Sequence, residues 1–121
     1  MSKVLVVDNS SSLLIVYKEY LTRRSIEVIT AETAAEALRI LERDKDISHL
    51  ITDIVLPCID GLTMIKAIRI EPEHYFSPKI FVHTGSLNHN QYLDSLLQEG
   101  KIQGYTFKPH SLTILYDFVC D

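Results

Sequence analysis

Five short runs rich in apolar and β-branched residues alternate with longer segments whose apolar residues recur at helical spacing. We expect these runs to be strands, at residues 3–7, 26–30, 49–52, 79–83 and 103–107. Strict alternation favours a parallel sheet with helices on both faces, because right-handed crossovers leave no other compact arrangement. The pattern therefore predicts an α/β fold built from five strand–helix units.

The segments between the runs carry signals for the starts and ends of helices. Serines at positions 10–12 offer N-caps, and Thr33 with Glu36 forms a capping-box pattern. Pro72 should end the third helix, and Gly100 is a plausible C′ residue for a helix near residues 89–99. The apolar stripes expected for the five helices are Leu13, Leu14, Tyr17, Tyr20 and Leu21; Ala34, Ala35, Leu38 and Leu41; Leu62, Ile65, Ile68 and Arg69; Leu93, Leu96 and Leu97; and Leu112, Leu115 and Phe118.

Length and composition limit the class of protein. The 121 residues fit one domain, and 46% apolar residues suffice for a core. A net charge of −4 argues against direct nucleic-acid binding, which usually needs a clustered basic excess. No N-terminal stretch reads as a signal peptide, because Asp8 and a polar run interrupt the apolar segment, and no apolar run nears the roughly 20 residues that span a membrane. We expect a soluble cytoplasmic protein, either complete or cut from a longer chain.

Polar residues stand where the predicted strands end. Asp8 and Asn9 follow the first strand, Asp53 the third, Thr84 the fourth and Lys108 the fifth. In parallel sheets, ligands bind at the carboxyl ends of the strands. Two carboxylates, an amide, a hydroxyl and an ammonium are therefore expected at one rim of the sheet.

This set of groups suits phosphoryl transfer to a carboxylate. An aspartate can act as a nucleophile and form an aspartyl phosphate. Transfer depends mainly on positioning and on cations that stabilise the phosphoryl oxygens. Carboxylate and carbonyl oxygens suit Mg²⁺, while Lys108 offers a point charge and Thr84 a hydroxyl donor.

Four segments resemble the receiver domains of two-component response regulators, the chemotaxis regulators among them. They are VLVVDNS, LITDIVLPCIDG, VHTG and GYTFKP, and the likeness runs over nearly the whole chain. The second and fourth are the specific ones, because an Asp followed by Pro and Asp-Gly, with a distant Lys-Pro, is rarely met by chance. The resemblance implies a flavodoxin-like (βα)5 three-layer sandwich with strand order 2-1-3-4-5.

The resemblance also implies roles for the residues at the rim. Asp53 matches the phosphorylated aspartate, and Lys108 the lysine that binds the phosphoryl group. Asp8 and Asn9 match the acidic pair that holds Mg²⁺, to which Val55 would add its main-chain carbonyl. The chain would take its phosphoryl group from a histidine kinase or a phosphotransfer protein, and would be no enzyme beyond this self-catalysed acceptance and slow dephosphorylation.

The signal would leave through a switch. By resemblance, Thr84 is the switch hydroxyl and Tyr105 the aromatic residue that turns inward when the hydroxyl moves toward the phosphoryl group. Together they would reshape the face built from the fourth helix, fifth strand and fifth helix. A downstream partner or an attached output domain would bind that face.

One departure from the family pattern concerns the metal site. Asn9 replaces an acid, so it keeps a carbonyl oxygen for the cation but brings no charge. We therefore expect weaker Mg²⁺ binding. The departure also leaves open an alternative, a degenerate receiver that acts as a phosphate-independent interaction module.

Two further classes of protein share part of this pattern. A haloacid-dehalogenase-type phosphatase also has a strand-ending Asp nucleophile, but it needs a second Asp where this chain has Val55. A flavodoxin-like FMN carrier needs a phosphate loop, of which the serines at 10–12 are a faint echo, and aromatic flanks. The chain has no Trp, and acids at the rim would repel a phosphate.

Overall fold

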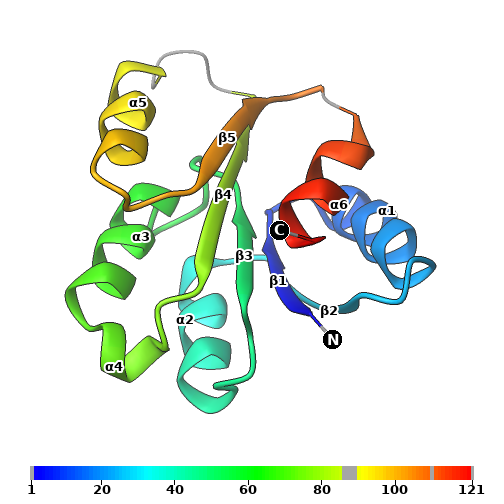
Figure 1. Ribbon diagram of the computed structural model, residues 1–121, viewed down its shortest axis with the longest axis horizontal. Helices are drawn as coiled ribbons and strands as arrows, with labels where there is room; N and C mark the ends of the chain where they lie inside the picture. The colour runs from blue at the N-terminus through cyan, green and yellow to red at the C-terminus, as the bar shows by residue number, and fades with distance from the viewer. Residues whose placement is uncertain (1, 86–89, 110, 121) are drawn as a thin grey trace.

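The computed structural model describes residues 2–85, 90–109 and 111–120, and it shows strands and helices in regular alternation (Figure 1). The elements in chain order are β1 (Lys3–Val7), α1 (Ser11–Thr22), β2 (Glu27–Ala31), α2 (Ala34–Arg43), β3 (His49–Thr52), α3 (Gly61–Ile70), α4 (Pro72–Tyr75), β4 (Lys79–Thr84), α5 (Asn90–Gln98), β5 (Gly104–Phe107) and α6 (Leu112–Cys120).

All five strands are parallel and lie in the order β2-β1-β3-β4-β5. Helices α1 and α6 cover one face of the sheet, and α2, α3, α4 and α5 lie on the other (Figure 1). The predicted three-layer α/β fold and its strand order are therefore confirmed.

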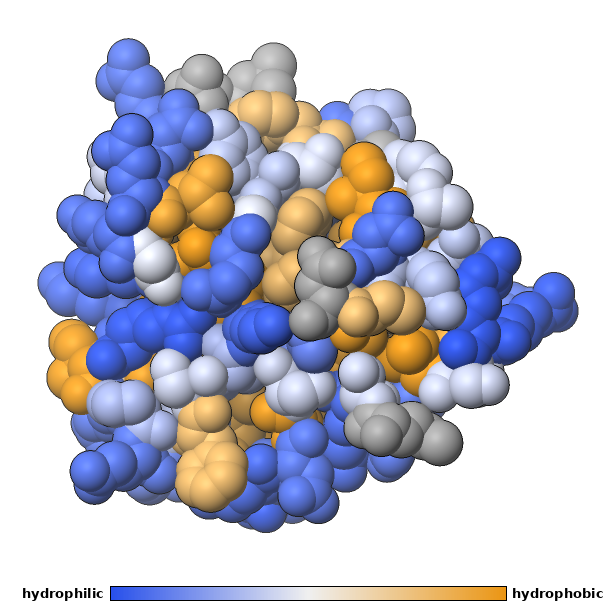
Figure 2. Space-filling view, viewed as in Figure 1, coloured by the Kyte–Doolittle hydropathy of each residue, from blue (hydrophilic) through white to orange (hydrophobic). Residues whose placement is uncertain are grey.

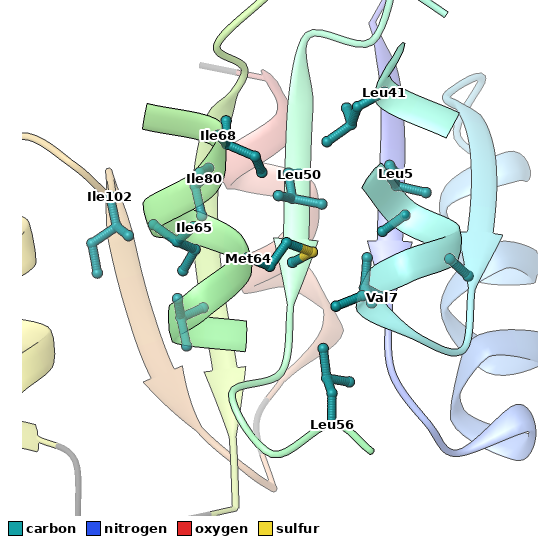
Figure 3. Packing of buried hydrophobic residues seen from close by; sticks show 14 of the residues in the cluster. Leu5, Val7, Leu41, Leu50, Leu56, Met64, Ile65, Ile68, Ile80 and Ile102 are labelled. Atoms are coloured by element: carbon teal, nitrogen blue, oxygen red, sulfur yellow. The ribbon is translucent and has the colours of Figure 1, made fainter. Parts of the chain in front are cut away.

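Alternate residues of each central strand feed two separate hydrophobic cores. Leu5 and Val7 of β1, with Leu50 of β3, point toward α2 and α3 (Figure 3). Val4 of β1 and Ile51 of β3 point the other way, into the core under α1 and α6. Both faces of β1 and β3 are thus buried, which explains why apolar residues follow one another directly at positions 4–7 and 50–51.

Several predicted details differ from the structure. Strand β2 begins and ends one residue later than expected, and the short helix α4 was not expected. Ala35 and Leu97 were placed in buried stripes but are exposed. Ala37 and Ile40 are buried in α2 instead, because the face that packs on the sheet is turned by about one residue.

Helix α4 shifts the numbering of the later helices, so the predicted output face consists of α5, β5 and α6. The expected start of its first helix at His89 lies outside the described residues. Both cysteines are free and exposed. Within the described ranges, no helix is long and apolar enough to cross a membrane.

Candidate functional site

The strand order brings the polar strand ends together. Strands β1, β3, β4 and β5 are consecutive neighbours, and all point the same way. Asp8 follows β1, Asp53 follows β3, Thr84 is the last residue of β4, and Lys108 follows β5. Four segments far apart in sequence therefore meet at one rim, as the sequence predicted.

The Lys108 ammonium joins the two carboxylates. Its Nζ donates to Asp8 Oδ2 at 2.5 Å and to Asp53 Oδ2 at 3.0 Å. Asp8 is 1% exposed and Asp53 is 7% exposed, so both charges lie largely out of water. Charged groups in such surroundings need a counter-ion, and Lys108 serves both carboxylates at once.

The pKa of Lys108 depends both on its burial and on the two carboxylates. Burial by itself lowers the pKa of the amine, since a buried ammonium loses hydration. The hydrogen bonds and charges of Asp8 and Asp53 outweigh the loss, and the pKa ends above its ordinary value. Lys108 is therefore a fixed cation at neutral pH.

Main-chain amides orient the Asp53 carboxylate. Its Oδ1 accepts hydrogen bonds from the N–H of Ile54 at 2.7 Å and of Val55 at 3.2 Å. Its Oδ2 is left to face Lys108. One oxygen is thus held by the loop after β3, and the other is directed into the rim.

Asp8 is held in a similar way. Its Oδ1 accepts from the N–H of Ser10 at 2.9 Å, and its own N–H donates to Ala31 of β2. The Ser10 side chain in turn accepts from the N–H of Leu13 and caps α1. The start of α1 and the position of the Asp8 carboxylate are therefore built from one turn.

The Asp60-Gly61 pair sets the distance between α3 and the loop that carries Asp53. The Asp60 side chain caps α3 by accepting from the N–H of Thr63 at 2.8 Å. The Gly61 N–H donates to Ile54 O at 2.7 Å. A Cβ at Gly61 would lie 2.2 Å from Asp53 O and 2.9 Å from Ile54 Cα, so only glycine fits this approach.

Two groups that the sequence analysis did not single out lie under the rim. The Nε2 of His83 is 3.6 Å from Asp8 Oδ2, and both side chains are buried. The Tyr17 ring of α1 meets the His83 ring edge to face, with centroids 5.2 Å apart. Burial raises the pKa of Tyr17; the charge of Lys108 opposes this rise, while the nearby carboxylates add to it.

The remaining predicted residues occupy different positions relative to this cluster. Asn9 is exposed beside Asp8, and Val55 is exposed in the loop after β3. Thr84 is fully buried, and its carbonyl accepts from the N–H of Lys108 at 2.7 Å. Main-chain pairing thus links the end of β4 to the residue that binds both carboxylates.

Tyr105 forms its hydrogen bond with helix α5. It is half-buried in β5, and its hydroxyl donates to Asp94 of α5. This hydrogen bond raises the pKa of the Tyr105 phenol. The hydrogen bond joins β5 to α5, and the switch role of Tyr105 stays a prediction.

The oxygen atoms at the rim include the kinds of ligand that Mg²⁺ prefers. No group of three or more His, Cys, Asp or Glu side chains arranged to hold a metal is found in the described part of the chain. The expected set does not need one, since it has two acids, the Asn9 amide oxygen and the Val55 carbonyl. Asp8 Oδ2 and Asp53 Oδ2 already converge on one cation, the Lys108 ammonium. These residues fit a hard divalent cation.

Comparison with known families identifies the chain. The model of the response regulator receiver domain matches residues 4–119. The chain belongs to this family. Receiver domains act in two-component and chemotaxis systems, and Mg²⁺ and phosphorylation are typical of the family.

Curated relatives of this receiver domain include chemotaxis proteins. A chemotaxis protein CheY homolog of Campylobacter jejuni is 39% identical over 83 residues, or 68% of this chain and 64% of that protein. Chemotaxis protein CheY1 of Helicobacter pylori is 36% identical over 83 residues, covering 68% of this chain and 67% of that protein. The chain thus matches just under two thirds of the length of the Campylobacter protein.

Solved structures agree with this assignment. A response regulator receiver protein from Pseudomonas putida has a TM-score of 0.87 at 28% identity, and the match covers 98% of this chain and 95% of that one. The chemotaxis response regulator CheY4 of Vibrio cholerae has a TM-score of 0.83 at 25% identity, with 99% and 97% covered. The receiver domain therefore resembles chemotaxis regulators in fold and in sequence.

Proposed function

We propose that this receiver domain accepts a phosphoryl group on Asp53 from a phosphohistidine of a histidine kinase or phosphotransfer protein. The observation that carries the proposal is the bridge from Lys108 Nζ to Asp8 and Asp53. A nucleophilic carboxylate, a second acid and a fixed cation converge at the rim where such sheets bind ligands. In this proposal, residues 1–121 form one receiver domain that works in the cytoplasm.

The reaction uses the oxygen that the loop leaves available. Asp53 Oδ2 attacks the phosphorus while main-chain amides hold Oδ1 in place. The bond between phosphorus and the imidazole nitrogen of the donor breaks, and the electron pair leaves with the imidazole, which takes up a proton. Lys108 moves from the Asp53 carboxylate to a phosphoryl oxygen, and the Thr84 hydroxyl donates to another.

Asp8, Asp53, the Asn9 amide oxygen and the Val55 carbonyl would hold Mg²⁺. When bound, the ion supplies positive charge to the phosphoryl oxygens. With one acid fewer than usual, the site binds the ion more weakly. The chain performs no chemistry on a separate substrate; it takes up one phosphoryl group and loses it slowly by hydrolysis.

The output runs through Thr84 and Tyr105. Movement of the Thr84 hydroxyl toward the phosphoryl group opens space for the Tyr105 ring, and turning the ring releases its hydroxyl from Asp94. The face formed by α5, β5 and α6 then changes for a downstream partner or an attached output domain. The phosphate-independent alternative is not favoured, because Asn9 is the one departure that supports it. The three charged groups, Asp8, Asp53 and Lys108, lie together at the rim.

Mass spectrometry tests the proposal. Incubation with acetyl phosphate and Mg²⁺ should add the mass of one phosphoryl group to the wild type and none to Asp53→Asn. Asp60→Asn is the matched control, because it removes a carboxylate from the same loop and keeps an N-cap. Labelling of Asp53→Asn, or no labelling of the wild type at any Mg²⁺ concentration, would refute the proposal.

A further inference from the structure

A groove between α3 and α5 takes no part in the proposed phosphoryl transfer. It encloses about 440 Å³. One wall carries Ile65 and Ile70 of α3, and the other carries Tyr92 and Leu96 of α5. Ile70 is 66% exposed and Tyr92 is 54% exposed, so the groove has large apolar groups in solvent. Figure 2 shows apolar surface among polar side chains over this side of the molecule.

The groove is basic although the chain is acidic. Lys66, Arg69 and Lys101 line it together with one acid, Glu99, whereas the whole chain has a net charge of −4. Glu99 pairs with Lys101 at 3.2 Å. Lys66 and Arg69 form no ion pair within the described residues. Electrostatic complementarity therefore favours an acidic partner here.

Arg69 is the central cation of the groove. Its guanidinium donates to Lys101 O at 2.8 Å, Pro78 O at 2.9 Å, Ser77 Oγ at 2.6 Å and Gln103 Oε1 at 3.2 Å, which are all neutral acceptors. Burial lowers the pKa of Arg69, since its charge has lost part of its hydration. A carboxylate at the mouth of the groove would supply the missing counter-charge.

The walls indicate the conformation of the partner. Both are helix flanks, spaced as Leu62, Ile65, Arg69 on α3 and Tyr92, Leu96, Glu99 on α5. Main-chain groups inside these helices are already bonded, so they offer no ladder to an extended peptide. A helix brings its own main-chain bonds satisfied and can lay an apolar stripe in such a groove.

We propose that the α3–α5 groove binds an acidic amphipathic helix of another protein, on the flank of α5 that faces α3 rather than on the α5–β5–α6 face. Apolar side chains of the helix pack against Ile70 and Tyr92, and flanking carboxylates pair with Lys66 and Arg69. The contact does not need the phosphoryl group.

NMR titration of the ¹⁵N-labelled chain tests this site. The probes are three helical peptides of about 15 residues that share one Leu/Phe stripe and carry Glu, Gln or Lys beside it. The Glu peptide should give saturable shifts confined to α3, α5 and residues 99–101. The Gln and Lys peptides should bind at least about fivefold more weakly.

Matched variants locate the contact. Ile70→Ser and Lys66→Glu should each weaken binding of the Glu peptide about fivefold. Ile15→Ser and Lys18→Glu are the controls, because Ile15 of α1 is also 66% exposed and α1 covers the opposite face. The controls should change the affinity less than about twofold.

Three results would overturn the proposal: no saturable shift in the groove with millimolar Glu peptide, equal binding of all three peptides, or equal loss in the controls. Concentration-dependent self-association that Ile70→Ser abolishes would also overturn it, since the occupant would then be a second copy. Acetyl phosphate labelling of the same variants, measured in parallel, reports on Asp53 alone. The two measurements therefore distinguish a wrong assignment of the groove from a wrong assignment of Asp53 as the phosphoacceptor.

Discussion

Gly61→Ala should destabilise this receiver domain by about 2 kcal/mol. The added Cβ would lie 2.2 Å from Asp53 O and 2.9 Å from Ile54 Cα, and neither main-chain atom can rotate away. Moving α3 outward costs about 1–3 kcal/mol in packing and weakens the 2.7 Å bond from Gly61 N to Ile54 O, worth about 1 kcal/mol. The lower entropy of an unfolded alanine returns about 0.4–1 kcal/mol.

Urea unfolding followed by circular dichroism measures this loss, with Gly85→Ala as the control. A Cβ at Gly85 meets no atom of the described residues within 4 Å, so that substitution should leave stability unchanged or raise it by up to about 1 kcal/mol. The two variants make the same chemical change in different surroundings. Equal unfolding midpoints for both would refute the argument that close approach at Asp53 requires glycine.

Three further outcomes follow from the site. Asn9→Asp adds a carboxylate at an exposed position and should tighten Mg²⁺ binding about tenfold by calorimetry; an unchanged affinity would remove residue 9 from the metal site. Burial lowers the pKa of Lys108, but its bonds to Asp8 and Asp53 raise the pKa by more, so the folded value lies above the unfolded pKa of about 10.4. The bridge therefore stabilises the fold fully below the unfolded pKa, and this stabilisation is lost as pH rises through the folded value. The melting temperature of the wild type should therefore fall more steeply above about pH 10 than that of Lys108→Met. Parallel curves of melting temperature against pH would contradict this. Asp60→Ala removes the cap of α3 and should cost about 1 kcal/mol in urea, whereas Asp60→Asn should cost much less.

The fold was largely predictable because its strands and helices differ in pattern. Strands β1 and β3 are buried on both faces, and apolar residues follow one another directly in them, at positions 4–7 and 50–51. The orientation of helices was harder to infer, as Ala35 and Leu97 show. Alanine and leucine are both compatible with either side of a helix, and the neighbouring elements decide which side is covered. Helix α4 has only four residues, too few for a periodic signal.

The rim was predictable for a different reason. Chain direction and strand order place every strand end at the same edge, so Asp8, Asp53 and Lys108 could be grouped before any contact was known. The surroundings of the rim depend on side-chain packing, which no spacing rule gives. His83 in a doubly buried strand was the available signal, since a buried polar residue needs a polar neighbour. No sequence pattern predicts the hydrogen bond from Tyr105 to Asp94.

The position of β5 in the sheet has a mechanical consequence. It is one of the two edge strands, it pairs with β4 alone, and none of its four residues is fully buried, whereas the other edge strand, β2, buries two of its five residues. Shifting β5 disturbs a single ladder, whereas shifting β1 or β3 would break two ladders and open both cores. Lys108 thus directly follows the strand that can shift with the least disruption of the sheet. A change at the rim can therefore move β5 at the edge of the sheet while the two hydrophobic cores keep their packing.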